Sequence, residues 1–144
     1  MVFQSSKNIY TVVLLWITVL FILIAPFLPA DNELETPKEL IFGIAILYTI
    51  AILIIWILLD TKYTINGKNL RYASGPIRGK INIEKITALE NVTTWYVTSF
   101  IKPALGYYGF TVRYEKFNDI YISPKDKEKF IEEILKINPN VMIR

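Results

Sequence analysis

The chain has 144 residues, 53% of them hydrophobic, and carries 16 Lys and Arg against 13 Asp and Glu. It contains no cysteine and no histidine, which excludes disulfide bonds, thiolate zinc ligands and the side chain that most often serves as general base or metal ligand. The charge is uneven, because residues 1–59 hold two basic and four acidic side chains, whereas residues 60–144 hold 14 basic and nine acidic ones.

Two long apolar runs without Asp, Glu, Lys or Arg dominate the first 60 residues, at positions 9–28 and 40–59. A helix of about 20 residues is about 30 Å long, which matches the hydrocarbon core of a bilayer. The core helix of a soluble protein keeps a polar stripe for water, and these runs have almost no polar side chains. We therefore predict a transmembrane helical hairpin within residues 1–60, with helices at about 9–28 and 40–59.

Basic residues that flank the two runs predict the orientation of the hairpin. The acidic connection at positions 29–39 has only Lys38, whereas Lys7 precedes the first run and three cations follow the second. Because Lys and Arg near membrane spans tend to stay cytoplasmic, we expect a multi-pass inner-membrane protein with both termini in the cytoplasm. A cleaved signal peptide is the competing interpretation of the first run, but such peptides have apolar stretches of only about 7–15 residues. Because the runs lack charged groups, we interpret them as anchors and not as a transport pathway.

After Asp60 the hydrophobic pattern changes to short alternating segments, which are typical of half-buried strands. Turn signals separate the segments at Asn66-Gly67, a pair favoured in type I′ hairpins, and at positions 74–76. We predict six or seven short antiparallel strands. They include residues 62–65, 69–72, 77–83, 86–89, 110–114 and 120–122.

One helix is predicted at the C-terminal end of the chain. Ser123 is placed to cap it, Pro124 suits its first position, and Asp126 lies where a capping-box partner would be. A sheet must cover its apolar face, so we predict an α+β fold in which residues 61–144 form a bent sheet or split barrel capped by this helix. The apolar stripe of the helix consists of Phe130, Ile131, Ile134 and Leu135.

Four short motifs after residue 60 are shared with a known family of domains. They are Tyr63, Ile65 and Leu70 in the first hairpin, Gly79 with Ile83 and Ile86, Ile122-Ser123-Pro124, and Asn138-Pro139. With two membrane helices before them, these motifs resemble the bacterial pleckstrin-homology-like (PH-like) proteins, and most closely the YyaB-like membrane-anchored group. The resemblance implies a PH-like sheet closed by one helix and a binding role without catalysis. Residues 93–108 depart from the family, which has a short serine-containing hairpin there.

The resemblance also suggests a place for an anionic ligand. Eukaryotic PH domains hold phosphorylated headgroups with basic residues on and around their first hairpin. A competing interpretation is a sheet edge that uses lysines to prevent pairing with other strands. We predict a non-catalytic module that binds an anionic lipid surface or a protein partner at the inner membrane face. The candidate patch consists of Lys62, Lys68, Arg71, Arg78 and Lys80.

A second candidate surface is the aromatic stretch before the fifth predicted strand. Aromatic side chains are typical anchors of protein interfaces. They are also expected in the core of a curled sheet, which we favour here, or in a loop that dips into lipid headgroups. The residues of this stretch are Trp95, Tyr96, Phe100, Tyr107 and Tyr108.

Other functions receive less support from the sequence. Self-protection against a secreted antimicrobial peptide is the alternative hypothesis, by likeness to other small bacterial membrane proteins with PH-like domains. Catalysis is disfavoured, because the domain lacks His, Cys and a glycine-rich phosphate loop. Nucleic-acid binding is disfavoured, since the basic residues are not concentrated on a helix. We therefore expect no catalytic residue, cofactor or metal site, and the sequence leaves the oligomeric state open.

Overall fold

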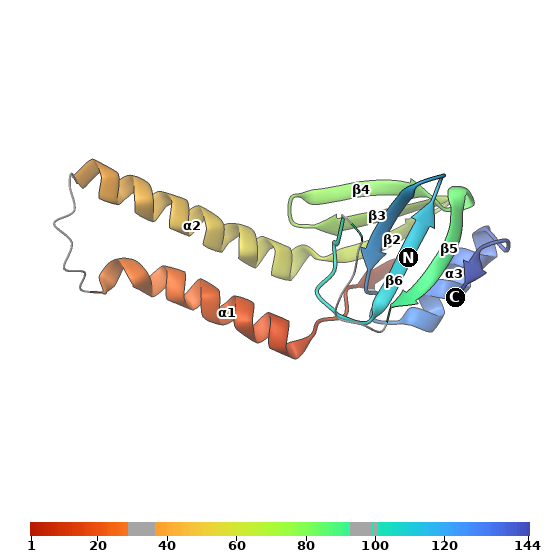
Figure 1. Ribbon diagram of the computed structural model, residues 1–144, viewed down its shortest axis with the longest axis horizontal. Helices are drawn as coiled ribbons and strands as arrows, with labels where there is room; N and C mark the ends of the chain where they lie inside the picture. Colours follow the sequence, from red (N-terminus) through yellow and green to blue (C-terminus); the bar gives the residue numbers. More distant parts are fainter. Residues whose placement is uncertain (29–36, 93–98, 100) are drawn as a thin grey trace.

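A computed structural model of the chain has two parts, a hairpin of apolar helices and a β-rich domain at one end of it (Figure 1). Helix α1 (Ile9–Ile24) continues into a 3₁₀ turn, η1 (Ala25–Phe27), and helix α2 (Pro37–Asp60) runs beside α1. Both predicted helices are thus present. The structure describes residues 1–28, 37–92, 99 and 101–144.

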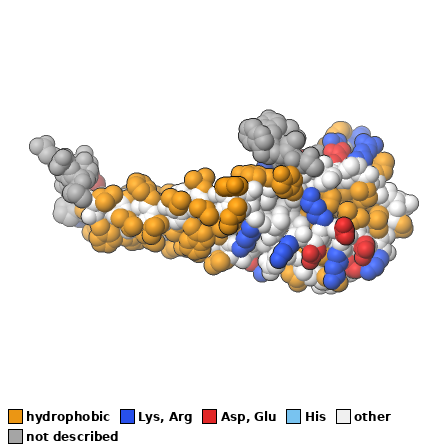
Figure 2. Space-filling model, turned by 90° about the horizontal axis from the view of Figure 1, so that it is seen from below, with side chains coloured by type: hydrophobic (Ala, Val, Ile, Leu, Met, Phe, Trp, Pro, Cys, Tyr) orange, Lys and Arg blue, Asp and Glu red, His pale blue; other side chains and the backbone are white. Residues whose placement is uncertain are grey.

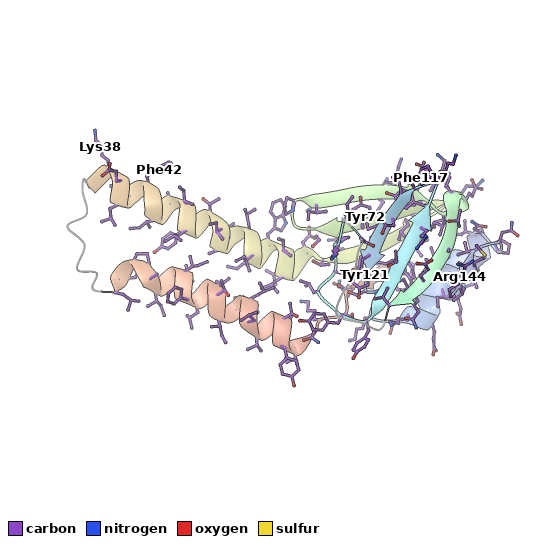
Figure 3. The ribbon with its side chains drawn as sticks, viewed as in Figure 1. Lys38, Phe42, Tyr72, Phe117, Tyr121 and Arg144 are labelled. Carbon is purple, nitrogen blue, oxygen red and sulfur yellow. The ribbon has the colours of Figure 1, made fainter. Side chains whose placement is uncertain are left out.

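The hairpin buries little of its apolar surface. Val19, Ile22 and Ala51 are buried where the two helices touch, and most of the other large side chains of the hairpin face outward, as Phe42 does in Figure 3. Figure 2 shows hydrophobic side chains covering this part of the molecule. Two segments, Ile9–Phe27 and Lys38–Asp60, are long and apolar enough to cross a membrane.

The first sheet consists of four antiparallel strands and includes the start of the chain. Its N-terminal strand was not predicted, because three residues are too few to show an alternating pattern. This strand adds residues from before the helical hairpin to the unit expected at 61–144. In spatial order the strands are β1 (Val2–Gln4), β2 (Lys62–Asn66), β3 (Asn69–Ser74) and β4 (Ile77–Asn82).

The first predicted hairpin is confirmed, but its turn differs from the prediction. Asn66 pairs with Asn69, so the turn residues are Gly67 and Lys68. Among the described residues before position 75, only Gly67 has a positive φ, of 55°. One positive φ at the first turn position is typical of a type II′ turn, whereas type I′ requires two. The predicted type I′ geometry is therefore wrong.

The second sheet lies across the first and has one parallel pair. A 3₁₀ turn, η2 (Ile83–Lys85), connects the two sheets. The last strand pairs in parallel with β5, whereas the other pairs of this sheet are antiparallel. In spatial order the strands are β7 (Asn118–Ile122), β6 (Gly109–Tyr114), β5 (Ile86–Val92) and β8 (Met142–Ile143).

Helix α3 (Lys127–Ile137) begins later than predicted. Asp126 takes the N-cap position without a side-chain cap, and Ser123 is buried. The backbone N–H of Ser6 donates to the Ser123 carbonyl at 2.6 Å, and that of Lys125 donates to the Gln4 carbonyl at 3.0 Å. Residues 123–125 are therefore held extended beside residues 4–6, and this pairing excludes the predicted cap at Ser123.

One hydrophobic core of 15 buried residues fills the space between the two sheets and α3. Phe130 on α3 lies at its centre, with ring centroids 5.3 Å from Phe3 and 6.4 Å from Phe110. Ile134 is buried beside it, and the other two residues of the predicted apolar stripe pack partly buried against the core. The predicted sheet closed by one helix is thus observed, as two sheets around a common core.

Candidate functional site

Four of the five cations of the predicted patch lie on one exposed face of the first sheet. They occupy the positions that alternate with core residues, so their side chains face away from the core. Arg71 pairs with Lys80 across β3 and β4, and Lys62 and Arg78 pair with Ala73 from either side. We call Lys62, Arg71, Arg78 and Lys80 the sheet cations.

Two of the sheet cations share a carboxylate at the end of α2. Asp60 lies 2.8 Å from the Lys62 ammonium and 2.5 Å from the Arg78 guanidinium. The guanidinium also lies over the ring of Trp56, 5.6 Å from its centroid. One carboxylate therefore faces two cations, so the group has a net charge of about +1 beside the last turn of α2.

The other two sheet cations stand next to each other. The ion pairs recorded among the described residues include neither Arg71 nor Lys80. Like charges on directly opposed strand positions repel each other and favour a bound anion. The outer face of this sheet is therefore an electropositive surface.

The fifth predicted cation, Lys68, lies apart from the others. It is in the β2–β3 turn, at the end of the sheet away from the helices, and forms an ion pair with Glu84 at 2.6 Å. The hydrogen bond in this pair raises the pKa of Lys68 and lowers that of Glu84. The structure thus does not bring Lys68 together with the sheet cations.

The β3–β4 turn rests directly on helix α2. Gly75 has a φ of 55°, and a Cβ atom there would come within 2.8 Å of Cγ1 of Ile57. The hydroxyl groups of Thr61 and Ser74 are 2.9 Å apart. These contacts fix the sheet relative to the helix, so the sheet cations stand at defined distances from the end of α2.

A buried cluster of hydroxyl groups joins the start of the chain to the domain. The Ser5 and Ser123 hydroxyls are 3.0 Å apart, and the backbone N–H of Ser123 donates to the Tyr63 hydroxyl at 3.0 Å. That hydroxyl donates to the Pro103 carbonyl at 2.6 Å. Burial raises the pKa of Tyr63, because desolvation disfavours its anion. This hydroxyl cluster ties the segment before α1 to β2 and to the extended segment that precedes α3.

A second buried tyrosine continues the cluster. The Tyr121 hydroxyl donates to the Gly106 carbonyl at 3.0 Å, and the backbone N–H of Gly106 lies 3.3 Å from the Ser123 hydroxyl. Burial and the neighbouring Tyr63 raise the pKa of Tyr121 to about 12. This cluster was not predicted, because its members are far apart along the chain and show no common spacing.

The structure places two of the five predicted aromatic residues. Tyr107 and Tyr108 are exposed beside the start of α1, and the Thr11 hydroxyl donates to the Tyr107 hydroxyl at 2.9 Å. They are therefore not core residues, although the core was the favoured interpretation of this stretch. Trp95, Tyr96 and Phe100 lie outside the described residues.

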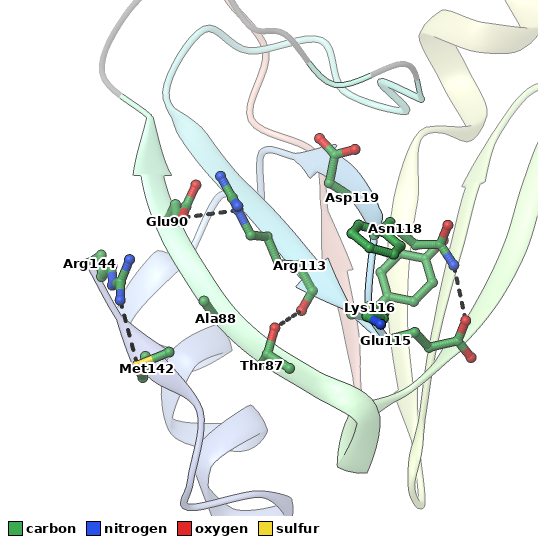
Figure 4. Close-up of a pocket in the computed structure, with 12 residues that line it drawn as sticks. Thr87, Ala88, Glu90, Arg113, Glu115, Lys116, Asn118, Asp119, Met142 and Arg144 are labelled. Carbon is green, nitrogen blue, oxygen red and sulfur yellow. Dashed lines mark hydrogen bonds and ion pairs between the residues drawn. The ribbon is translucent and has the colours of Figure 1, made fainter.

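A hollow of about 440 Å³ on the second sheet was not predicted (Figure 4). Charged side chains line it, and several of them are neutralised by ion pairs. Arg113 pairs with Glu90 at 3.0 Å, and Glu115 pairs with Lys85 at 2.9 Å. Phe117 in the β6–β7 turn is exposed beside it and lies at the end of the domain away from the helices (Figure 3). The hollow therefore lacks the surplus of one charge that marks the first sheet.

Comparison with known proteins identifies the domain. No curated protein and no solved structure matches the chain. The bacterial PH domain family matches residues 61–138, which is more than half of the chain and includes β2 to β7 and α3. PH domains are generally binding modules without catalytic activity. The predicted YyaB-like subgroup stays a prediction. The chain belongs to the bacterial PH domain family.

Proposed function

We propose that this protein is a non-catalytic binding module, anchored in the membrane by α1 and α2, whose sheet cations dock its PH domain on an anionic lipid surface. The observation that carries the proposal is the surplus of positive charge on the first sheet, next to the end of an apolar helix.

The exposed apolar surface of the hairpin supports the anchor. Along α2, Ile46 and Ile50 are 46% and 42% exposed, and they lie near the middle of the candidate span Lys38–Asp60. Exposing this surface to water costs about 25 cal/mol of free energy for each Å² of apolar area. Lipid tails meet it without that cost, and a helix satisfies its own backbone hydrogen bonds in lipid.

Charges at the two ends of the hairpin support its orientation. Lys7 and Lys62 lie at the end where the domain is, whereas positions 29–39 at the other end hold four acidic residues and Lys38. The positive-inside rule then places the domain and both termini in the cytoplasm. A cytoplasmic domain faces the inner leaflet, whose anionic lipids give that surface a negative potential.

The distances of the sheet cations from the helix end support docking. Lys62 and Arg78 are beside the last turn of α2, and Arg71 and Lys80 are two residues further along their strands, about 7 Å away. This is within the screening length of about 8–10 Å at physiological salt. Each cation near the surface then contributes about 1 kcal/mol of attraction. Lys68 is at the far end and is not part of the proposed surface.

A single spin label tests the docking in the full-length chain. The chain has no cysteine, so Thr64→Cys on the outer face of β2 gives one labelling site beside Arg71. The nitroxide is relaxed by a lipid that carries chelated Ni²⁺, in bilayers of phosphatidylcholine with or without phosphatidylglycerol. We expect stronger relaxation with phosphatidylglycerol. The double variant R71Q/K80Q should weaken docking by roughly 30-fold and restore the neutral-bilayer value.

A matched control separates position from net charge. The double variant K85Q/K116Q removes two charges beside the hollow of the second sheet, at the end of the domain away from the helices. It should leave the relaxation of the Thr64→Cys label unchanged. Equal relaxation in neutral and anionic bilayers would contradict the proposal. The protein-partner and self-protection hypotheses stay predictions, since no contact described above selects them.

A further inference from the structure

A groove of about 470 Å³ lies where α1 leaves the domain. Its walls come from the segment before α1, the loop that carries Tyr107 and Tyr108, and the residues that lead into α3. Three lysines line it, and its lining residues include no Asp or Glu. These lysines, Lys7, Lys125 and Lys127, do not belong to the patch predicted from the sequence.

Backbone pairing brings two of these lysines together from opposite ends of the sequence. The N–H of Lys125 donates to the Gln4 carbonyl at 3.0 Å, and the N–H of Asn8 donates to the Leu105 carbonyl at 3.1 Å. Lys7 and Lys125 are both exposed, and the ion pairs recorded for the described residues include neither of them. Their charges are thus held at the groove and available to an anion.

The third lysine adds charge from a fixed position. The Lys127 ammonium donates to the Asn91 side-chain oxygen at 3.3 Å and lies over the Phe110 ring, 5.4 Å from its centroid. Neither of these contacts neutralises it. The groove therefore collects three positive charges, and Figure 2 shows Lys and Arg side chains on this face where the helices meet the domain.

The groove opens at the boundary between the domain and the hairpin. Ile9, the first residue of the candidate span Ile9–Phe27, forms part of its wall. Tyr10 and Tyr108 are 79% and 60% exposed at the same level, and Tyr107 is bonded to Thr11 in the first turn of α1. Tyrosines at this level are typical of the belt where lipid headgroups meet the acyl chains.

We propose that this groove binds the phosphodiester headgroup of one anionic phospholipid. Lys7 and Lys125 contact the phosphate oxygens. Tyr107 and Tyr108 flank the glycerol, and the acyl chains continue along α1 past Ile9. The inference rests on the proposed membrane anchor, because only the anchor places the groove at headgroup level. A lipid is favoured over a soluble anion because the groove joins cationic side chains to an exposed apolar helix end.

Native mass spectrometry of the full-length chain in detergent tests the groove without depending on docking of the sheet. The wild type, K7Q/K125Q and the control K85Q/K116Q are each titrated with phosphatidylglycerol, and the fraction that retains one lipid is measured. We expect the wild type and the control to retain one lipid alike. K7Q/K125Q should lose affinity by somewhat more than fivefold per lysine, roughly 30-fold in all. Unchanged circular dichroism of the variants verifies that they are folded.

The other outcomes each overturn the inference in a distinct way. Equal retention by all three proteins would show that the lysines of the groove do not bind the lipid, while the spin-label result on the sheet would be unaffected. If the wild type retained phosphatidylcholine as well as phosphatidylglycerol, the charge of the lysines would not explain lipid binding. Displacement of the lipid by inorganic phosphate or glycerol 3-phosphate at comparable concentration would assign the groove to a soluble anion. By contrast, unchanged relaxation of the label in R71Q/K80Q, with one lipid still retained, would contradict the proposed docking and leave this inference standing.

Discussion

The helical hairpin and the PH domain use apolar side chains in opposite ways. In the domain, 15 of the described residues, most of them from the two sheets and α3, are buried in one core. In the hairpin, three buried residues mark the contact between the helices, and most of the large apolar side chains face outward. Both regions contain many large apolar side chains, but only the domain buries most of them. This difference is what the proposed anchor requires, with lipid around the hairpin and water around the domain.

The junction between these regions combines features of both. Trp56, Tyr10 and Tyr108 give it exposed aromatic surface, while Lys7 and Arg78 give it charge. Buried hydroxyl groups and the contact of the β3–β4 turn with α2 hold it together. Function is therefore expected at the junction, where a membrane surface would meet the domain. The predictions below test this division, beginning with the largest effect.

The strongest test changes the outer surface of the hairpin. Ile46 and Ile50 lie one helical turn apart on α2, and both are exposed. Replacing both with Lys should disfavour membrane insertion by about 5–7 kcal/mol, because a charge near the centre of a span costs about 2.5–3.5 kcal/mol. Extraction with carbonate measures the fraction that stays in the membrane. The matched variant I46A/I50A should stay there, and a more soluble, folded I46K/I50K protein would show that this surface faces water.

The corresponding test in the domain removes a core side chain. Phe130→Ala should lower the free energy of unfolding of the domain by about 3–5 kcal/mol, because its fully buried ring leaves a cavity beside Phe3 and Phe110. Denaturant unfolding of the full-length chain in detergent measures the loss. Phe42→Ala removes the same ring from an exposed position of α2 and should leave the stability of the domain unchanged. Equal losses in the two variants would contradict the division into two solvents.

Hydroxyl groups at the junction give an intermediate effect. Tyr63→Phe leaves the Pro103 carbonyl and the Ser123 N–H without their partner, which should cost about 1–3 kcal/mol of domain stability. Tyr72→Phe is the matched control, since no hydrogen bond of its hydroxyl is recorded among the described residues. Amide exchange at Ser123 should accelerate in Tyr63→Phe alone. An unchanged exchange rate at Ser123 would mean that the hydroxyl cluster does not hold the segment that precedes α3.

The sequence predicted those parts of the fold that local patterns determine. Alternation along the chain located six strands, and the apolar stripe of Phe130 and Ile134 located the last helix. Strand β1 was missed, because its pairing with β2 joins residues about 60 positions apart. Pairing between distant residues, 4–6 with 123–125, is also the reason why Ser123 does not cap the last helix as predicted.

The site was predicted as a set of residues but not as an arrangement. The alternating pattern of the strands, which is visible in the sequence, is enough to place Arg71 and Lys80 on the exposed face. Nothing in the sequence shows that Asp60 reaches both Lys62 and Arg78, or that Lys68 pairs with Glu84. The groove at Lys7 and Lys125 depends on contacts between the two ends of the chain, so no local pattern indicates it.

The pKa of a buried tyrosine gives a prediction for alkaline pH. The pKa of Tyr121 is raised to about 12 in the folded chain, from an ordinary value of 10.0. The protonated form is therefore favoured by folding, and its contribution to stability is complete below pH 10 and is lost as the pH rises to about 12. Unfolding measured at intervals over this range should show a decline in stability. Tyr121→Phe should flatten the decline, and a wild-type curve that stays level would contradict the burial of this hydroxyl.

The smallest effect is expected at the end of the domain away from the helices. Lys68 and Glu84 form a pair whose side chains are 68% and 47% exposed, and water and salt screen the attraction within such a pair. Lys68→Gln should therefore change the free energy of unfolding only slightly. It should also leave the lipid-dependent relaxation of the Thr64→Cys label unchanged, because Lys68 is already neutralised and lies beyond the sheet cations. A loss of relaxation as large as that in R71Q/K80Q would shift the proposed lipid-binding surface from the junction to the tip of the first hairpin, since the neutralised cation would then be the one that docks.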